Sequence, residues 1–198
     1  MPQQSPNSPL VLASTSPTRK SLLDRLEIQY SQQSPEMDET PLEGETPQAL
    51  VERLAYGKAA SIARSNPDAV VIGSDQISVC DNLLIGKSGS IKRAIKQLDQ
   101  FSGKTVDFYT AVCVMRETDG FCETHLDHTS VTFRSLTIDE IERYLAAEPA
   151  IECAGSFKVE SLGITLFDQV VSKDPTALPG LPLIATARLL REAGFNVP

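Results

Sequence analysis

A short apolar run, a hydroxyl-rich turn and an amphipathic helical pattern follow one another over residues 9–26. The run Pro9–Ala13 has the length of a buried strand, and the turn that follows leads into a helix that we expect to begin at Pro17. Ser16 suits the N-cap position, and Pro17 suits the first helical position, where a missing N–H donor costs nothing. The apolar face of this helix comprises Leu22, Leu23 and Leu26.

The open end of this helix has the features of an anion site. Unpaired backbone N–H groups and the positive end of the helix dipole favour phosphate there, and Arg19 adds a planar fork that can hold two phosphate oxygens. The alternative is a capped helix on which Arg19 and Lys20 are simply solvated. This segment alone leaves both interpretations open.

Strand-like and helix-like segments alternate along the rest of the chain. We expect helices over 47–63, 90–101, 137–147 and up to residue 193, and strands over 69–72, 77–79, 83–85, 106–115, 122–136 and 164–171. The polar segment 34–46 has the composition of a loop. The pattern predicts an α/β fold, a single domain over residues 9–198 with a mixed twisted sheet flanked by helices, preceded by a disordered polar lead of residues 1–8.

Charge and hydropathy argue against nucleic acids and membranes as partners of this protein. The 198 residues carry a formal net charge of −8, and the longest basic runs are pairs such as Arg19-Lys20, so nucleic-acid backbones would be repelled. No apolar run approaches the ~20 residues that a membrane-spanning helix needs. The first eight residues also lack the basic start and apolar stretch of a secretion signal. We therefore expect a cytoplasmic protein that binds neither nucleic acid nor membrane.

The cysteines are widely spaced and form no Cys-x-x-Cys pair. They are Cys80, Cys113, Cys122 and Cys153. This spacing favours reduced core thiols over a zinc site or disulfides.

Polar side chains follow two of the expected strands. Ser14 follows the first strand, and Asp75 ends the segment that follows the strand 69–72. Ligands of open α/β sheets bind outside the carboxyl ends of the strands, so Ser14, Arg19 and Asp75 could share a cleft there. A carboxylate in that place could take a proton from water or hold a divalent cation. The alternative for Asp75 is a structural aspartate that caps a loop.

Lys58 has an unusual place in the helix 47–63. It lies four residues from both Leu54 and Ile62, on the same stripe as the apolar side chains. Either its stem packs while the ammonium group escapes to water, or the ammonium group faces inward.

Taken together, these residues resemble the Maf family of nucleoside triphosphate pyrophosphatases over nearly the whole chain. The matching motifs occur in the family's order. They are Leu-Ala-Ser14-Thr-Ser-Pro-Thr-Arg19, Asp38-Glu39-Thr40, Leu54-Ala-Tyr-Gly-Lys58-Ala, Ile72-Gly-Ser-Asp75-Gln76, Gly86-Lys87, Ser102-Gly103, Val131-Thr-Phe-Arg134, Cys153-Ala-Gly-Ser-Phe-Lys158-Val-Glu160-Ser-Leu-Gly163 and Gly180-Leu-Pro-Leu183.

The resemblance implies a fold similar to that of Ham1 and inosine triphosphatase proteins, with a cleft at the strand ends. It implies hydrolysis between the α and β phosphates, giving a nucleoside monophosphate and pyrophosphate, with Mg²⁺ or Mn²⁺ required. The resemblance also implies a role for each residue that matches a position of the family's motifs. Asp75 is the general base, Ser14, Arg19, Lys58 and Lys87 bind the triphosphate, Glu39 helps to bind the metal, and Thr18, Gln76 and Glu160 select the base.

Gln76 and Glu160 are similar to the branch that acts on 7-methylguanosine triphosphate. A carboxylate at Glu160 can accept both parallel donors of guanine, N1–H and the 2-amino group, and methylation at N7 strengthens that pairing by making the ring cationic. Two residues depart from the family pattern: Thr18 stands where relatives often carry Arg or Trp, and Lys20 stands where they carry a second Arg.

Two other functions remain open from the sequence. One is the dTTP and UTP pyrophosphatase activity of the same family. The other is a nucleotide-sensing protein that binds a triphosphate without hydrolysing it. The resemblance is also compatible with a homodimer.

Overall fold

A computed structural model describes residues 8–198 of the chain. Contacts group these residues into two compact units. The first unit comprises the chain up to Asp75, Thr110–Asp127 and Asp174–Pro198, and the second unit comprises Gln76–Tyr109 and His128–Lys173. The predicted lead of residues 1–8 lies, apart from Ser8, outside the described residues, and the single-domain organisation stays a prediction.

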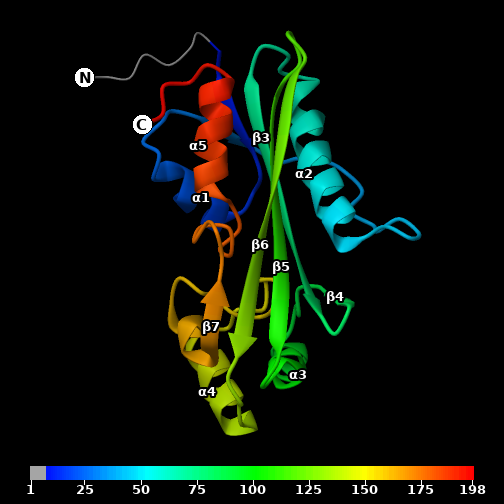
Figure 1. Cartoon of the computed structure of the whole chain (residues 1–198), viewed down its shortest axis with the longest axis vertical. Helices are drawn as coiled ribbons and strands as arrows, with labels where there is room; N and C mark the ends of the chain where they lie inside the picture. The colour runs from blue at the N-terminus through cyan, green and yellow to red at the C-terminus, as the bar shows by residue number, and fades with distance from the viewer. Residues whose placement is uncertain (1–7) are drawn as a thin grey trace. The chain divides into compact units, whose positions relative to one another are not determined.

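Over residues 8–198 the strands form one mixed sheet of seven strands (Figure 1). The strands are β1 (Leu10–Ala13), β2 (Ser31–Gln33), β3 (Val70–Cys80), β4 (Leu83–Ile85), β5 (Thr105–Arg116), β6 (Phe121–Phe133) and β7 (Phe167–Val171). The hydrogen-bonded order is β2-β1-β3-β5-β6-β7, and β4 pairs with β3. β1 runs parallel to β2 and β3, whereas β4 and β7 run antiparallel to β3 and β6. This sheet, with its helices, confirms the predicted α/β class.

Hydroxyl side chains cap several of the helices. The helices in the described part of the chain are α1 (Pro17–Asp24), α2 (Pro47–Ala63), α3 (Ile91–Phe101), α4 (Ile138–Ala147), α5 (Leu183–Glu192) and the 3₁₀ helix η1 (Leu162–Leu166). Ser16 accepts a hydrogen bond from the N–H of Arg19, as the sequence predicts, and Thr46 accepts one from the N–H of Ala49. None of these helices combines the length and the apolar character that a membrane crossing requires.

In the first unit, helices cover both faces of β1 and β3 (Figure 1). Alternate residues of the strands, such as Leu12 and Ile72, pack in one core with Leu23 of α1 and Leu189 of α5. The opposite face of β3 meets α2, which lies on the other side of the strands in Figure 1. Both faces of these parallel strands are therefore buried, which explains their continuous apolar sequence.

Gly73 lets α2 approach β3 closely. A Cβ atom at this position would overlap the carbonyl oxygen of Ala55 and lie 2.5 Å from the backbone nitrogen of Ala59. Both neighbours are helix backbone, which cannot give way as the end of a flexible side chain can. The close approach matters because Lys58 lies on the same part of α2.

We expect Gly73→Ala to lower the free energy of unfolding by about 3 kcal/mol, because the added methyl group must push α2 away from β3. Urea denaturation followed by circular dichroism measures this change. Gly86→Ala is the matched control, since a Cβ atom at Gly86 meets nothing within 4 Å. Equal stability of the two variants would contradict the close packing of α2 on β3.

The second unit has an aromatic core. The rings of Phe133 and Phe157 pack edge-on, with their centroids 5.6 Å apart. Each also packs edge-on against Phe167, at centroid distances of 4.9 Å for Phe133 and 4.8 Å for Phe157. The hairpin between β3 and β4 turns at Asp81 and Asn82, both of which have positive φ angles, as the two-residue turn requires.

Four local features differ from the predictions. The strands expected over 69–72 and 77–79 form one strand, β3. The strand β2 was not expected, because its sequence Ser31–Gln33 is entirely polar. Residues 164–166 belong to η1 rather than to the strand predicted over 164–171. The prediction of core thiols holds for Cys80 and Cys113, whereas Cys122 is exposed, and all four cysteines are free.

Candidate active site

A buried lysine joins two carboxylates in the first unit. The Lys58 Nζ atom of α2 lies 2.6 Å from Asp75 Oδ1 and 2.7 Å from Glu39 Oε1. The side chains of Lys58 and Asp75 are 10% and 11% exposed, whereas that of Glu39 is 59% exposed. The interpretation in which the Lys58 ammonium group escapes to water is therefore wrong, because the group is buried and ion-paired.

The end of β1 makes room for this cluster. β1 stops at Ala13, beside Gly73, while β3 continues to Cys80. Asp75 consequently lies within β3 but beyond the last residue of β1. The predictions that Asp75 comes after its strand, or caps a loop, are wrong. Arg19 and Asp75 pair beyond the carboxyl end of β1. In Figure 1, α2 lies on one face of the strands here and α1 lies on the other.

Arg19 of α1 supplies a second cation beside Asp75. Its Nη2 atom lies 3.9 Å from Asp75 Oδ1, and its Nε–H donates to the carbonyl oxygen of Gly180 at 2.9 Å. Burial lowers the pKa of this guanidinium group, and the charges of Asp75 and Glu39 oppose that effect. Because arginine stays protonated in proteins, the cluster holds two cations and two anions. The alternative of a solvated Arg19 is wrong.

The turn before α1 is internally hydrogen-bonded. Ser14 is buried, and its Oγ atom accepts from the N–H of Ser16 at 3.1 Å. The N–H groups of Ser16 and Arg19 are thus both paired with serine hydroxyls, and the second of these bonds is the one that the N-cap prediction for Ser16 requires. The Ser14 hydroxyl still has its own proton to donate. Thr18 is half-buried on α1, next to Arg19.

The carbonyl group of Gly180 is a hydrogen-bond partner of Arg19 that the sequence analysis missed. It lies in the loop before α5, far along the chain from Arg19, and fixes the direction of the guanidinium group. Gly180 has a φ of +122°, a conformation that favours glycine. The motif Gly180-Leu-Pro was visible in the sequence, but nothing local links its backbone to Arg19.

Asp174 fastens the loop that contains Gly180. One carboxylate oxygen accepts from the N–H and the hydroxyl of Thr176, at 2.9 and 2.6 Å, and the other accepts from the N–H of Ile184 at 2.7 Å. The bond from Ile184 satisfies an N–H group in the first turn of α5, where the helix dipole also favours a negative charge.

The loop that carries Glu39 is also pinned. Arg53 of α2 forms a double ion pair with Glu45, at 2.7 and 2.8 Å, and donates to the carbonyl oxygen of Thr40 at 3.0 Å. The hydrogen bonds from Arg53, with a further one from the N–H of Leu42, lower the pKa of Glu45 to about 2. Glu39 itself is exposed, but its neighbour in sequence is tied to α2.

In the second unit, the segment of Lys87 is hydrogen-bonded to the segment that follows α4. Lys87 and Ala154 form an antiparallel bridge, and the N–H of Gly89 donates to the carbonyl oxygen of Ile151 at 3.0 Å. Gln97 of α3 contacts both segments, because it donates to the Gly86 carbonyl oxygen and accepts from the Ser156 hydroxyl.

Charged residues of this second unit act on one thiol. Burial raises the pKa of Cys153, the charges of Lys158 and Lys87 lower it, and those of Glu160 and Glu148 raise it. Lys87 and Glu160, which the sequence analysis selected separately, therefore belong to one neighbourhood. Both are exposed.

A family model described as "Maf-like protein" matches residues 9–193. This chain belongs to the Maf family. Similar proteins include the 7-methyl-GTP pyrophosphatases of Xanthomonas campestris pv. campestris (57% identical; 96% of this chain, 98% of the relative), Polaromonas sp. strain JS666 (52%; 94% and 85%) and Idiomarina loihiensis (45%; 95% and 96%). Among solved structures, the Staphylococcus aureus Ham1 protein matches with a TM-score of 0.46 and 16% identity, over 64% of this chain and 72% of that chain.

The residues selected from the sequence of this Maf protein fall into two groups. Ser14, Thr18, Arg19, Glu39, Lys58 and Asp75 belong to the first unit, and Gln76, Lys87 and Glu160 belong to the second. Within the first group, ion pairs join Asp75 to Arg19 and Lys58, and Lys58 to Glu39. Gln76 follows Asp75 directly, so alternation along β3 directs its side chain to the opposite face of the sheet.

The carboxylates of this Maf protein suit a divalent cation that also contacts phosphate. Within residues 8–198 no group of three or more His, Cys, Asp or Glu side chains is arranged to hold a metal. However, Asp75 and Glu39 converge on one ammonium group, and Mg²⁺ commonly takes one or two carboxylates together with phosphate oxygens. The donor set therefore fits a metal that arrives with a polyphosphate.

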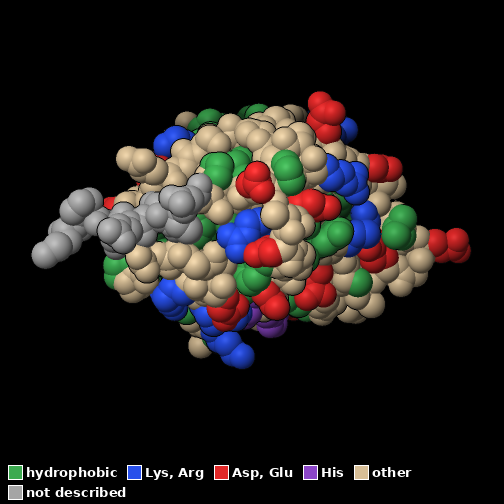
Figure 2. Space-filling model, turned by 90° about the horizontal axis from the view of Figure 1, so that it is seen from above, with side chains coloured by type: hydrophobic (Ala, Val, Ile, Leu, Met, Phe, Trp, Pro, Cys, Tyr) green, Lys and Arg blue, Asp and Glu red, His purple; other side chains and the backbone are tan. Residues whose placement is uncertain are grey.

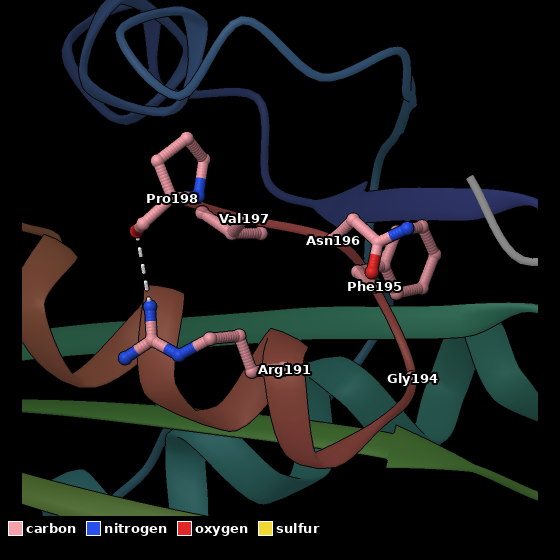
Figure 3. Close-up of a pocket in the computed structure, with 6 residues that line it drawn as sticks. All are labelled: Arg191, Gly194, Phe195, Asn196, Val197 and Pro198. Atoms are coloured by element: carbon pink, nitrogen blue, oxygen red, sulfur yellow. Dashed lines mark hydrogen bonds between the residues drawn. The ribbon is translucent and has the colours of Figure 1, made fainter. Parts of the chain in front are cut away.

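A surface cavity of about 490 Å³ lies at the carboxyl end of the chain (Figure 3). It is lined by Arg191 and residues 194–198, and Arg191 donates to the carbonyl oxygen of Pro198 at 3.2 Å. None of the selected site residues lines it. On the face shown in Figure 2, basic and acidic side chains are interspersed, with no extended basic surface.

Proposed function

We propose that this Maf protein is a metal-dependent nucleoside triphosphate pyrophosphatase that clears 7-methyl-GTP from the cytoplasmic nucleotide pool. The cluster of Lys58, Arg19, Asp75 and Glu39 carries the proposal, because it combines cations for phosphate with a buried carboxylate for water. The names of the relatives at 45–57% identity support the substrate. A triphosphate carries about four negative charges, so several cations must offset its desolvation.

In this proposal Lys58, Arg19 and Ser14 bind the phosphates, as does Lys87. When the triphosphate binds, Lys58 exchanges its carboxylate partners for phosphate oxygens, which leaves Asp75 free to accept a proton. Asp75 takes that proton from a water molecule as the water oxygen bonds to the α phosphorus. The bond from the α phosphorus to the bridging oxygen breaks, and pyrophosphate leaves.

Glu39 would help to hold the divalent cation once Lys58 has turned to the phosphates. A bound Mg²⁺ or Mn²⁺ supplies positive charge to phosphate oxygens whose negative charge grows during hydrolysis. The side chains of Arg19 and Lys58 also stabilise the negative charge on these oxygens.

Base selection is assigned to Glu160, with Gln76 and Thr18. We expect Glu160→Gln to lower the preference for 7-methyl-GTP over UTP by about 10-fold, measured as a ratio of kcat/KM values, because the amide presents only one acceptor to guanine. Glu152→Gln makes the same chemical change at an exposed position of the same unit. An unchanged ratio in Glu160→Gln would show that another residue reads the base.

A panel of nucleotides tests the proposed function. The protein is incubated with 7-methyl-GTP, GTP, dTTP, UTP and CTP, with Mg²⁺, with Mn²⁺ or with EDTA, and pyrophosphate release is measured. Metal-dependent release, fastest from 7-methyl-GTP, is the expected result. Fastest release from dTTP or UTP would assign the protein to the other activity of the family. Binding without release from any triphosphate would indicate a nucleotide sensor.

A further inference from the structure

Tyr144 of α4 and Glu148, which caps the carboxyl end of α4, hold the turn that carries Glu160. The N–H of Lys158, at the start of the turn, donates to the Tyr144 hydroxyl oxygen at 3.2 Å. That hydroxyl donates to Glu148 Oε2 at 2.9 Å, and the other oxygen of Glu148 accepts from the Ser161 hydroxyl. Tyr144 and Glu148 are one helical turn apart, so together they fasten both sides of Glu160 to the same end of α4.

The backbone of the turn is also closed on itself. The N–H of Ser161 donates to the carbonyl oxygen of Lys158 at 3.3 Å. A Cβ atom at Gly163 would overlap that same Lys158 backbone, so only glycine lets the chain fold back this closely. Before the turn, Phe157 is buried in the aromatic core of the second unit. Glu160 thus projects, exposed, from a turn whose flanks are fixed.

Tyr144 is suited to act as a neutral link. It is 4% exposed, and burial, with the hydrogen bond to Glu148, raises the pKa of its hydroxyl group. The neutral hydroxyl can accept from Lys158 and donate to Glu148 at the same time. Removal of the hydroxyl would break both links at once and leave the ring in place.

We infer that Tyr144 and Glu148 are positioning residues for base selection, which act through the turn 158–161 on the orientation of the Glu160 carboxylate. The inference rests on the proposed function and on the role given there to Glu160. A carboxylate that accepts two parallel donors must be held in both position and plane, and an exposed side chain on a loose turn would not be. Neither Tyr144 nor Glu148 needs to contact the nucleotide for this effect.

The test compares Tyr144→Phe and Glu148→Ala with wild type. Each variant should lower the ratio of kcat/KM for 7-methyl-GTP to that for UTP by about 10-fold, with kcat for UTP nearly unchanged. Tyr109→Phe is the matched control, because it removes a hydroxyl from β5, outside this network. Hydrogen–deuterium exchange of the peptide spanning residues 156–163 should be faster in both test variants than in wild type and in the control.

A double-mutant cycle separates positioning from a general loss of structure. If Tyr144 acts through Glu160, Tyr144→Phe should change the substrate ratio less than twofold when Glu160→Gln is already present. An equal effect in both backgrounds, or an unchanged ratio in the single variants of an active protein, would overturn this inference alone. Absence of pyrophosphate release by the wild type would overturn the proposed function, and the inference with it.

Discussion

Asp75→Asn should lower kcat by at least ~100-fold while the protein stays folded, because the variant keeps the shape of the side chain and loses the group that accepts a proton from water. The asparagine carbonyl oxygen can still accept the hydrogen bond that Lys58 donates at 2.6 Å. Lys58 also retains Glu39, so its charge is not left unpaired in the variant.

The experiment measures pyrophosphate release under saturating 7-methyl-GTP, together with thermal unfolding and nucleotide affinity. Asp99→Asn is the matched control, since Asp99 is exposed on α3 and the same charge is removed. A fall in kcat without loss of affinity would fit the role of a base. Near-normal turnover in a folded Asp75→Asn variant would remove Asp75 from the mechanism.

Lys58→Met should lower kcat/KM by ~100-fold or more, since it removes a buried cation that the phosphates need. The variant leaves Asp75 and Glu39 facing the incoming triphosphate, with Arg19 as the remaining ion-pair partner of Asp75. The loss should appear mainly as a higher KM, because the positive charge serves binding in the ground state as well as in the transition state.

Lys58→Met should also lower the free energy of unfolding by about 3 kcal/mol, because the buried Asp75 carboxylate loses its nearest partner. Lys96→Met, at an exposed position of α3, removes the same charge and serves as the control. Unchanged kcat/KM in Lys58→Met would contradict the phosphate-binding role. Unchanged stability would show that Asp75 is satisfied without the lysine.

Features that depend on a few neighbouring residues were predictable. Ser16 and Thr46 cap helices because their hydroxyls lie within reach of the N–H three residues on. The helical period placed Lys58 on the buried face of α2, although the period could not show what its ammonium group meets. The structure supplied that partner, since Asp75 is brought beside Lys58 by sheet packing at Gly73.

Features that depend on long-range contacts were not predictable from one sequence. β2 is polar and is a strand only because it pairs with β1. The Gly180 carbonyl lies beside Arg19 because Asp174 holds the loop that contains it. Every residue has a backbone carbonyl group, so the residue type at position 180 could not indicate this contact. Tyr144 looks like an ordinary residue of an amphipathic helix, and Glu148 like a polar residue at its end, until the fold brings the turn 158–161 beside them.

The pinning of the loop before α2 bears on how quickly the site can rearrange. Arg53 anchors the backbone at Thr40, so the backbone of the adjacent residue Glu39 has little freedom to move. Release of Glu39 from the ammonium group then needs only rotation about side-chain bonds, which takes picoseconds to nanoseconds for exposed residues. When a nucleotide binds, Glu39 can therefore leave the Lys58 ammonium group without a slower movement of the main chain in this segment.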